Sequence, residues 1–316
     1  MQTALVTGGG GFVARHIIPA LMARGWAVRA VVRRASDLVP AGAQVVAVGD
    51  ILDADWDSHL RGVSAIVHLA ARAHRMGESG PGAEPLYRRD NVEATGVLSR
   101  AAARAKISRF VFMSSVKAMG ESTPIDAPWN EQSPCVPVDA YSRTKLAAER
   151  ELLDQSARSG LPVVILRAPL LYGPRVKGNM QRLLSWIDRG FPLPLASVRN
   201  LRSLLYTGNL ADAICGCLEH PGAVGQTFLL SDGEDLSTPE LIRRLARARG
   251  RRAKLLPMPP RALLWCARVA GRSPEAERLM GSLRVDSSRI RKLLEWTPPF
   301  TVEAGLLETA RGSKTP

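Results

Sequence analysis

The sequence predicts an α/β protein built on a doubly wound parallel sheet. In the first 170 residues, short β-branched apolar runs alternate with longer helical patterns, and a glycine-rich loop follows the first run. The expected strands are Thr3–Thr7, Ala27–Val32, Gln44–Val48, Ala65–Leu69, Arg109–Ser114 and Pro162–Arg167. Apolar runs of five or six residues between helices are typical of parallel strands that are covered on both faces. Helices on both faces of one sheet are therefore expected.

The helical patterns divide the chain into two regions. The expected helices are Phe12–Arg24, about Ala83 to Ala105, Ala140–Ser159, Met180–Arg189 and Pro239–Arg249. After Pro169, prolines and glycines become frequent and the β-α rhythm ends. We therefore expect a sheet domain over residues 1–170 and a smaller, mainly helical region over residues 171–316 that shapes a substrate pocket. A strand near residues 226–230 is expected to join the sheet.

The glycine loop lies between the first strand and the first helix. In Gly8-Gly9-Gly10-Gly11-Phe12-Val13-Ala14, Gly8 falls at a tight turn, Gly11 where backbone must approach a ligand, and Ala14 where helix and strand pack closely. A pyrophosphate placed there rests on a helix N-terminus, where free N–H groups favour negative charge. The sequence thus predicts a Rossmann unit that binds a dinucleotide.

The end of the second strand carries Arg33 and Arg34 where NAD-binding chains have an acidic residue. A guanidinium there would pair with a 2′-phosphate, which favours NADP(H) with NAD(H) as the alternative. The alternative is that both arginines only form part of an exposed surface in an arginine-rich chain. Asp50 and Ile51, after the third strand, are expected near the adenine.

A second pattern predicts proton transfer. Tyr141 and Lys145 are one turn apart on an expected helix, and Ser115 follows an expected strand at the edge where such sheets bind ligands. A free tyrosine has a pKa of about 10, and a neighbouring ammonium favours the phenolate. We therefore expect Lys145 to lower the pKa of Tyr141, which then exchanges a proton with a substrate oxygen held by Ser115.

The composition of the chain limits which binding partners are expected. The net charge is +14, but the arginines are scattered and are not interleaved with aromatic residues, so solvated helix faces are expected rather than a nucleic-acid surface. The four cysteines show no metal-ligand spacing, so no metal is expected. The apolar stretch Ala262–Ala270 is too short to span a bilayer, so we expect a cytoplasmic protein without a membrane partner.

Taken together, these motifs resemble the extended short-chain dehydrogenase/reductases of the nucleotide-sugar epimerase/dehydratase type. Besides the glycine loop and the Tyr141/Lys145 pair, the resemblance rests on His68-Leu69-Ala70-Ala71, Asn91, Ser114-Ser115, Tyr172-Gly173-Pro174 and Trp296-Thr-Pro298. It implies that Ser115, Tyr141 and Lys145 are catalytic and that Asn91 supports the active-site helix. It also implies substrate contacts from Ser115, Lys117, Asn179 and Arg202, and relatives of this type often form homodimers. The residues it implies at the cofactor are Gly8, Gly10, Gly11, Phe12, Val13, Arg33, Arg34, Asp50, Ile51, Leu69, Ala70, Ala71, Asn91, Tyr141, Lys145 and Pro169.

Departures from the family pattern guide the choice of reaction. The 4,6-dehydratases carry an Asp-Glu pair directly after the catalytic serine or threonine, where this chain has Val116 and Lys117. Because valine transfers no proton, dehydration is not expected. The preferred hypothesis is an NADPH-dependent reductase acting on the C4 keto group of a UDP-linked hexose or hexosamine. The alternative is a UDP-hexose 4-epimerase, followed by a reductase of a non-nucleotide carbonyl or a non-catalytic cofactor sensor. His74 and Met76 lie on a loop that either lines the sugar site or forms plain surface.

Overall fold

The computed structural model describes residues 2–73, 82–269, 271 and 273–312. Its central element is a seven-stranded sheet with the order β3-β2-β1-β4-β5-β6-β9, in which all neighbouring strands are parallel. The strands are β1 Thr3–Thr7, β2 Ala27–Val32, β3 Gln44–Ala47, β4 Ala65–His68, β5 Arg109–Ser115, β6 Val163–Ala168 and β9 Thr227–Leu229. The doubly wound parallel sheet predicted from the sequence is confirmed.

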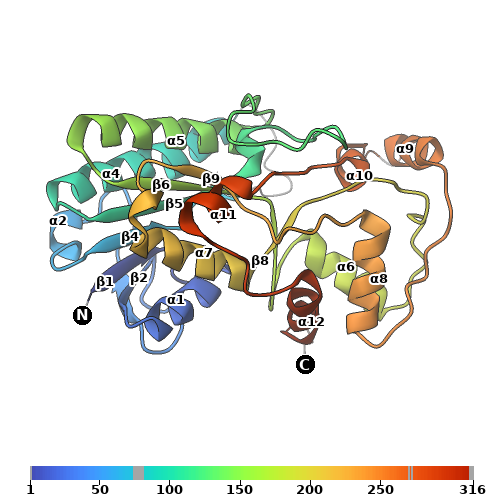
Figure 1. Cartoon of the computed structure of the whole chain (residues 1–316), viewed down its shortest axis with the longest axis horizontal. Coiled ribbons are helices and arrows are strands. Elements are labelled where there is room, and N and C mark those ends of the chain that lie inside the picture. Colours follow the sequence, from blue (N-terminus) through green and yellow to red (C-terminus); the bar gives the residue numbers. More distant parts are fainter. Residues whose placement is uncertain (1, 74–81, 270, 272, 313–316) are drawn as a thin grey trace.

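Helices cover both faces of this sheet (Figure 1). One face packs against α1 (Ala14–Ala23) and α7 (Thr207–Glu219), and the other against α4 (Ala94–Arg104) and α5 (Ala140–Ser159). Strands β4 and β6 are buried along their whole length, and β5 is buried apart from Arg109, Met113 and Ser115, because two apolar layers enclose these strands. Elements from after residue 170 also belong to this layered body: β9, which the sequence predicted, and the helices α7 and α11 (Ser288–Leu294), which it did not.

The helix expected over residues 83–105 is interrupted. Residues Ala83–Tyr87 form α3, Arg88–Glu93 form a π-helical turn, and α4 begins at Ala94. The prediction of one continuous helix was therefore wrong in its middle. The side chain of Asn91, within the wide turn, bonds the backbone of Arg72. Turns of this kind recur at functional sites.

The rest of the C-terminal half forms a smaller body beside the carboxyl ends of the strands (Figure 1). Its core lies between α6 (Asn179–Asp188), α8 (Thr238–Ala248) and α12 (Val302–Gly312), around the short pair β7 (Leu170–Tyr172) and β8 (Leu204–Tyr206). The remaining helices are α2 Trp56–His59, α9 Pro260–Val269 and α10 Ser273–Met280. No helix in the described part of the chain is long and apolar enough to cross a membrane.

Candidate active site

The glycine loop is pressed between β2 and the end of β4. Gly8 has a positive φ of 69°, and a Cβ on it would lie 3.1 Å from the backbone nitrogen of Ala70. A Cβ on Gly9 would lie 2.9 Å from that of Ala30. Helix α1, which follows, has no side-chain cap and no acidic residue in its first turn. Its free N–H groups and dipole fit a pyrophosphate, so the loop fits the dinucleotide expected from the sequence.

A buried threonine and histidine fix the strand ends beside this loop. The Thr7 hydroxyl accepts hydrogen bonds from the backbone N–H groups of Leu69 and Ala70, both at 3.1 Å, and pairs with His68 Nδ1 at 2.6 Å. His68 Nε2 lies 3.0 Å from the Thr95 hydroxyl. Burial lowers the pKa of His68 to about 3, so the ring is neutral and structural. The bonds hold Leu69 and Ala70 against the loop.

Ser115 and Tyr141 meet at the carboxyl edge of the sheet. Ser115 is the last residue of β5 and Tyr141 is the second residue of α5, and their side chains lie close enough to interact. Burial raises the pKa of Tyr141 to about 12, although the nearby Ser115 hydroxyl acts in the opposite direction. The two side chains expected to contact one reacting oxygen are thus adjacent.

The expected effect of Lys145 on Tyr141 is not observed, because its ammonium is directed elsewhere. It donates to the Met113 carbonyl at 2.6 Å and lies 4.1 Å from the centre of the Phe112 ring. Burial lowers the pKa of Lys145 itself to about 7, and Glu149 opposes this shift. The prediction of a lowered pKa for Tyr141 was therefore wrong for this state of the chain. Burial is the largest influence on the pKa of Tyr141, and burial also disfavours the charged form of Lys145.

Two contacts fix the N-terminal end of α5. Asp139 caps the helix by accepting from the Ser142 backbone N–H at 2.7 Å, and the Ser142 hydroxyl returns a bond to the Asp139 backbone. Asn91 donates from Nδ2 to the Thr144 hydroxyl at 3.1 Å. Asn91 therefore contacts α5 one residue before Lys145, as expected of a residue that supports this helix.

A buried ion pair lies one helical turn beyond Lys145, and sequence reasoning missed it. Glu149 on α5 accepts from Arg167 Nη2 at 2.6 Å and from Arg167 Nε at 3.1 and 3.2 Å. It also accepts from the Ser114 hydroxyl. Both charged side chains are almost fully buried. The position of Glu149 four residues after Lys145, on the same helix face, was the available signal.

The substrate residues implied by the resemblance are dispersed. Lys117 pairs with Glu121 at 2.7 Å and with Asp139 at 3.0 Å, so its ammonium already has two carboxylate partners. Arg202 is partly buried. Its guanidinium donates to the backbone carbonyl of Arg278 in α10 at 2.7 Å and to that of Gly281, just after α10, at 3.0 Å. Asn179 is exposed at the start of α6. His74 and Met76 lie outside the described residues.

At the end of the site where the adenosine is expected, arginine side chains cluster around the carboxylates of Asp50 and Asp90. Asp50 pairs with Arg89, and Asp90 pairs with Arg72 at 3.1 Å and with Arg89 at 3.0 Å. Arg33 is 76% exposed and reaches Asp90 only at 3.9 Å. Arg34 is exposed, while Ile51 packs against the apolar core under β3. The remaining cofactor positions lie at strand ends: Ala71 is exposed after β4 and Pro169 is buried after β6.

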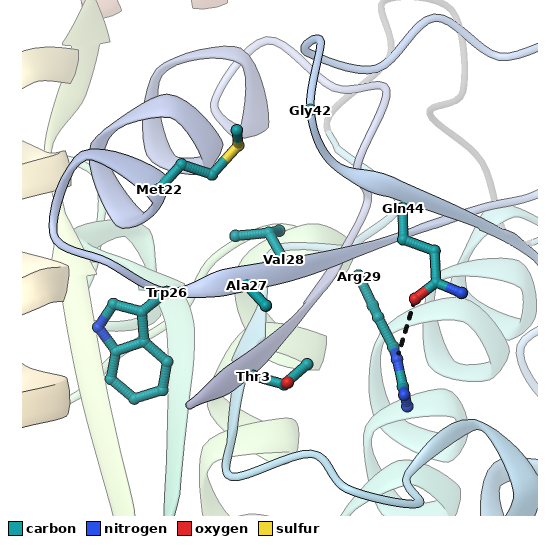
Figure 2. Close-up of a pocket in the computed structure, with 8 residues that line it drawn as sticks. All are labelled: Thr3, Met22, Trp26, Ala27, Val28, Arg29, Gly42 and Gln44. Carbon is teal, nitrogen blue, oxygen red and sulfur yellow. Dashed lines mark hydrogen bonds between the residues drawn. The ribbon is translucent and has the colours of Figure 1, made fainter. Parts of the chain in front are cut away.

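A separate hollow of about 320 Å³ lies at the opposite edge of the sheet (Figure 2). It is lined by residues at the start of β1 and β2, including Thr3, Ala27 and Arg29. Arg29 is satisfied there by Gln44 at 3.2 Å and by the carbonyls of His59 and Arg61 at 2.9 and 2.8 Å. Because the hollow lies at the amino ends of β1 and β2, it is separate from the carboxyl edge that carries Ser115 and Tyr141.

A Rossmann sheet with an adjacent serine and tyrosine at its carboxyl edge defines a nicotinamide-dependent enzyme of the short-chain dehydrogenase type. The sequence model of the "NAD dependent epimerase/dehydratase family" matches residues 4–230. The chain is 36% identical to a UDP-glucose 4-epimerase of Vibrio cholerae, over 98% of this chain and 95% of that protein. The chain belongs to the NAD dependent epimerase/dehydratase family and is an enzyme of that family.

Solved structures share the whole architecture. UDP-glucuronic acid 4-epimerase of Bacillus cereus, in complex with NAD, superposes with a TM-score of 0.81 at 21% identity and covers 99% of each chain. MoeE5, in complex with UDP-glucose and NAD, has a TM-score of 0.80 at 25% identity and covers 99% of this chain and 98% of that one. The α/β sheet with a helical C-terminal region is thus the fold of known epimerases.

Proposed function

We propose that this chain is a UDP-hexose 4-epimerase that retains NAD. The observation that carries the proposal is the pair of neighbouring Ser115 and Tyr141 side chains at the carboxyl edge of the sheet, on a chain 36% identical to a UDP-glucose 4-epimerase over nearly its full length. This reverses the order of the two leading hypotheses drawn from the sequence. The reductase hypothesis rested on an NADP(H) preference, whereas the family is NAD dependent and its named relatives favour epimerisation.

The reaction assigns a distinct role to each catalytic side chain. Tyr141 removes the proton from the C4 hydroxyl of the sugar and later returns one, and Ser115 holds that oxygen between the two steps. NAD, which the glycine loop at Gly8 to Gly11 would hold, would supply the acceptor and donor of the C4 hydride. Lys145 binds the nicotinamide ribose and, turned away from the Met113 carbonyl, favours the Tyr141 phenolate. Residues 171–316 form the region that holds the UDP-sugar, with Arg202 and Asn179 as candidate contacts of the diphosphate.

The residues beside Ser115 argue against dehydration. Val116 is 3% exposed and apolar, so it has no group that moves a proton. Lys117 is held by Glu121 and Asp139, so its ammonium is already neutralised. Loss of water from the sugar needs an acid and a base at these positions, and neither is present.

The test is an assay of the purified chain with UDP-glucose and no added cofactor, with the product sugars resolved by NMR. We expect conversion to the C4 epimer by protein that carries NAD, and a loss of about 10²- to 10⁴-fold in kcat for Tyr141→Phe. Tyr87→Phe is the matched control, since the Tyr87 ring packs edge-on against Tyr141 at 6.4 Å and its hydroxyl donates to the Ala73 carbonyl at 3.3 Å. If neither UDP-glucose nor its N-acetylamino or uronic acid counterpart is epimerised, the proposal is wrong.

Arg33 favours a second candidate, the NADPH-dependent C4 ketoreductase. Its guanidinium is largely exposed where a 2′-phosphate of NADP would lie, and Arg34 follows it. This candidate predicts that NADPH is consumed stoichiometrically with a UDP-4-keto sugar and that Arg33→Ala raises the KM for NADPH at least tenfold. Epimerisation without NADPH consumption rules it out.

A further inference from the structure

One helix of the C-terminal region has an apolar face that no part of the described chain covers. In α9, Leu263 packs inward against the core shared with α6 and α8. The outer side carries Ala262, Trp265 and Val269, which are spaced three and four residues apart and so form one stripe. Trp265 is 67% exposed and Val269 is 72% exposed. We call these three residues the outer stripe.

The chain around the outer stripe is predominantly basic, although Glu277 is exposed on the neighbouring helix α10. Residues 241–274 contain ten arginines and lysines and no aspartate or glutamate. Helical periodicity places Arg261 and Arg268 together along one flank of the stripe. Arg252 and Lys254, on the segment that leads into α9, are exposed as well. Within the described residues, none of these four cations is in an ion pair.

The position of α9 in the fold also favours docking through this helix. In Figure 1, α9 lies at the outer end of the C-terminal region, far from the sheet, and α10 lies between it and the start of α5. A flat surface can therefore approach the outer stripe without closing the active site. The catalytic side chains are all on β5 and α5, so docking through α9 leaves them accessible.

We propose that α9 docks this enzyme on an anionic lipid surface, with the outer stripe in the headgroup layer and the flanking cations on the lipid phosphates. A short helix with an aromatic apolar face and a basic flank has the composition of an interfacial anchor, and Trp is the side chain best suited to that layer. This binding surface goes beyond the epimerase chemistry and replaces the expectation that the basic residues are only solvated and that no membrane takes part.

Charge also distinguishes an anionic lipid surface from two other possible partners, a second copy of this chain and a nucleic acid. A second copy of the chain, meeting the stripe about a twofold axis, would bring the same cations face to face. A nucleic acid would satisfy the cations but would leave Val269 and Ala262 without apolar partners. An anionic bilayer matches both the charge and the apolar face.

The test is co-sedimentation of the full chain with vesicles of phosphatidylcholine alone or mixed with phosphatidylglycerol. We expect binding only to the mixed vesicles, weakened by high salt. Arg261→Gln with Arg268→Gln should lower the partition coefficient about 30-fold, and Trp265→Ala at least tenfold. A blue shift of tryptophan emission on mixed vesicles should be absent in Trp265→Phe. Because these side chains are exposed, the thermal unfolding midpoint should not change.

Matched controls lie on α5, at the other end of the molecule. Arg150→Gln with Arg158→Gln removes the same charge from exposed positions, and Leu153→Ala trims an exposed apolar side chain. Both should leave vesicle binding nearly unchanged. The proposal is overturned by absence of binding to mixed vesicles, or by equal losses in the control and α9 variants. Lipid-free dimerisation that is lost in Trp265→Ala would also overturn it and would assign the stripe to a second copy.

Discussion

Replacing Glu149 by glutamine tests whether the buried ion pair beneath the active site stabilises the chain. The substitution preserves the volume of the side chain and leaves an acceptor for Ser114, but it removes the charge that faces Arg167. The Arg167 guanidinium then stays buried without a counter-ion. Removing one partner of such a pair costs about 3–5 kcal/mol. Because glutamine still accepts a hydrogen bond, we expect the lower end, about 3 kcal/mol of the free energy of unfolding.

The same helix supplies a matched control. Glu151 pairs with Arg100 at 3.2 Å, but these side chains are 31% and 51% exposed. Solvent screens such a pair, so Glu151→Gln should cost less than about 1 kcal/mol. Both variants make the same chemical change in the same helix, and they differ only in burial.

Two measurements separate the outcomes. Urea unfolding at neutral pH gives the free energy of unfolding of both variants, and the reasoning fails if Glu149→Gln loses no more than Glu151→Gln. The second readout is the pH profile of kcat. Glu149 opposes the fall in the pKa of Lys145 to about 7, so Glu149→Gln should lower that pKa further. The alkaline limb of the kcat profile should then move to lower pH, which a purely structural role of Glu149 would not cause.

Three further substitutions test other parts of the site. Gly8→Ala should cost about 1–2 kcal/mol of stability and abolish NAD binding, because the residue has positive φ and its Cβ would press on Ala70; calorimetry with NAD measures the binding. Asp139→Ala removes the cap of α5 and should cost about 1 kcal/mol in urea unfolding. Lys145→Met should abolish epimerisation yet raise the free energy of unfolding near pH 6, by up to about 5 kcal/mol at about 1.4 kcal/mol per pKa unit, since burial lowers the folded-state pKa to about 7. The unfolded chain then binds more protons than the folded one, so this gain shrinks as pH rises from about 7 towards 10.5.

Each of these variants has its own control. Gly62→Ala also changes a glycine of positive φ, but it has open space around its Cβ, so it should lower stability without affecting NAD binding. Asp139→Asn keeps the capping oxygen and should restore most of the stability lost in Asp139→Ala. Lys292→Met, at an exposed position, should give no gain at any pH. A gain for Lys145→Met that persists above pH 10 would contradict the assignment to burial.

The sequence predicted the strands and helices of the sheet domain because local residue patterns largely determine them. Strands β1 and β2 and helix α5 coincide with the predicted ranges to the residue, since β-branched runs and helical spacing report local preference. The glycine loop was predicted from its spacing and from its place between an expected strand and an expected helix. The π-helical turn at Arg88–Glu93 was not, since it accompanies side-chain bonds of Asn91 to residues distant in the sequence. Helix α7, which covers one face of the sheet, was missed because its own residues do not indicate which surface it packs against.

The sequence by itself determined a dinucleotide-binding sheet and the spacing of Ser115, Tyr141 and Lys145. Only the tertiary structure decided the electrostatics of that site: it directs the Lys145 ammonium to the Met113 carbonyl, raises the pKa of Tyr141, and buries Glu149 against Arg167. It also decided that Lys117 is neutralised by two carboxylates while Trp265 stays uncovered. The reason is that residue spacing sets which side chains share a face, whereas burial and charge depend on segments that meet only when the chain is folded.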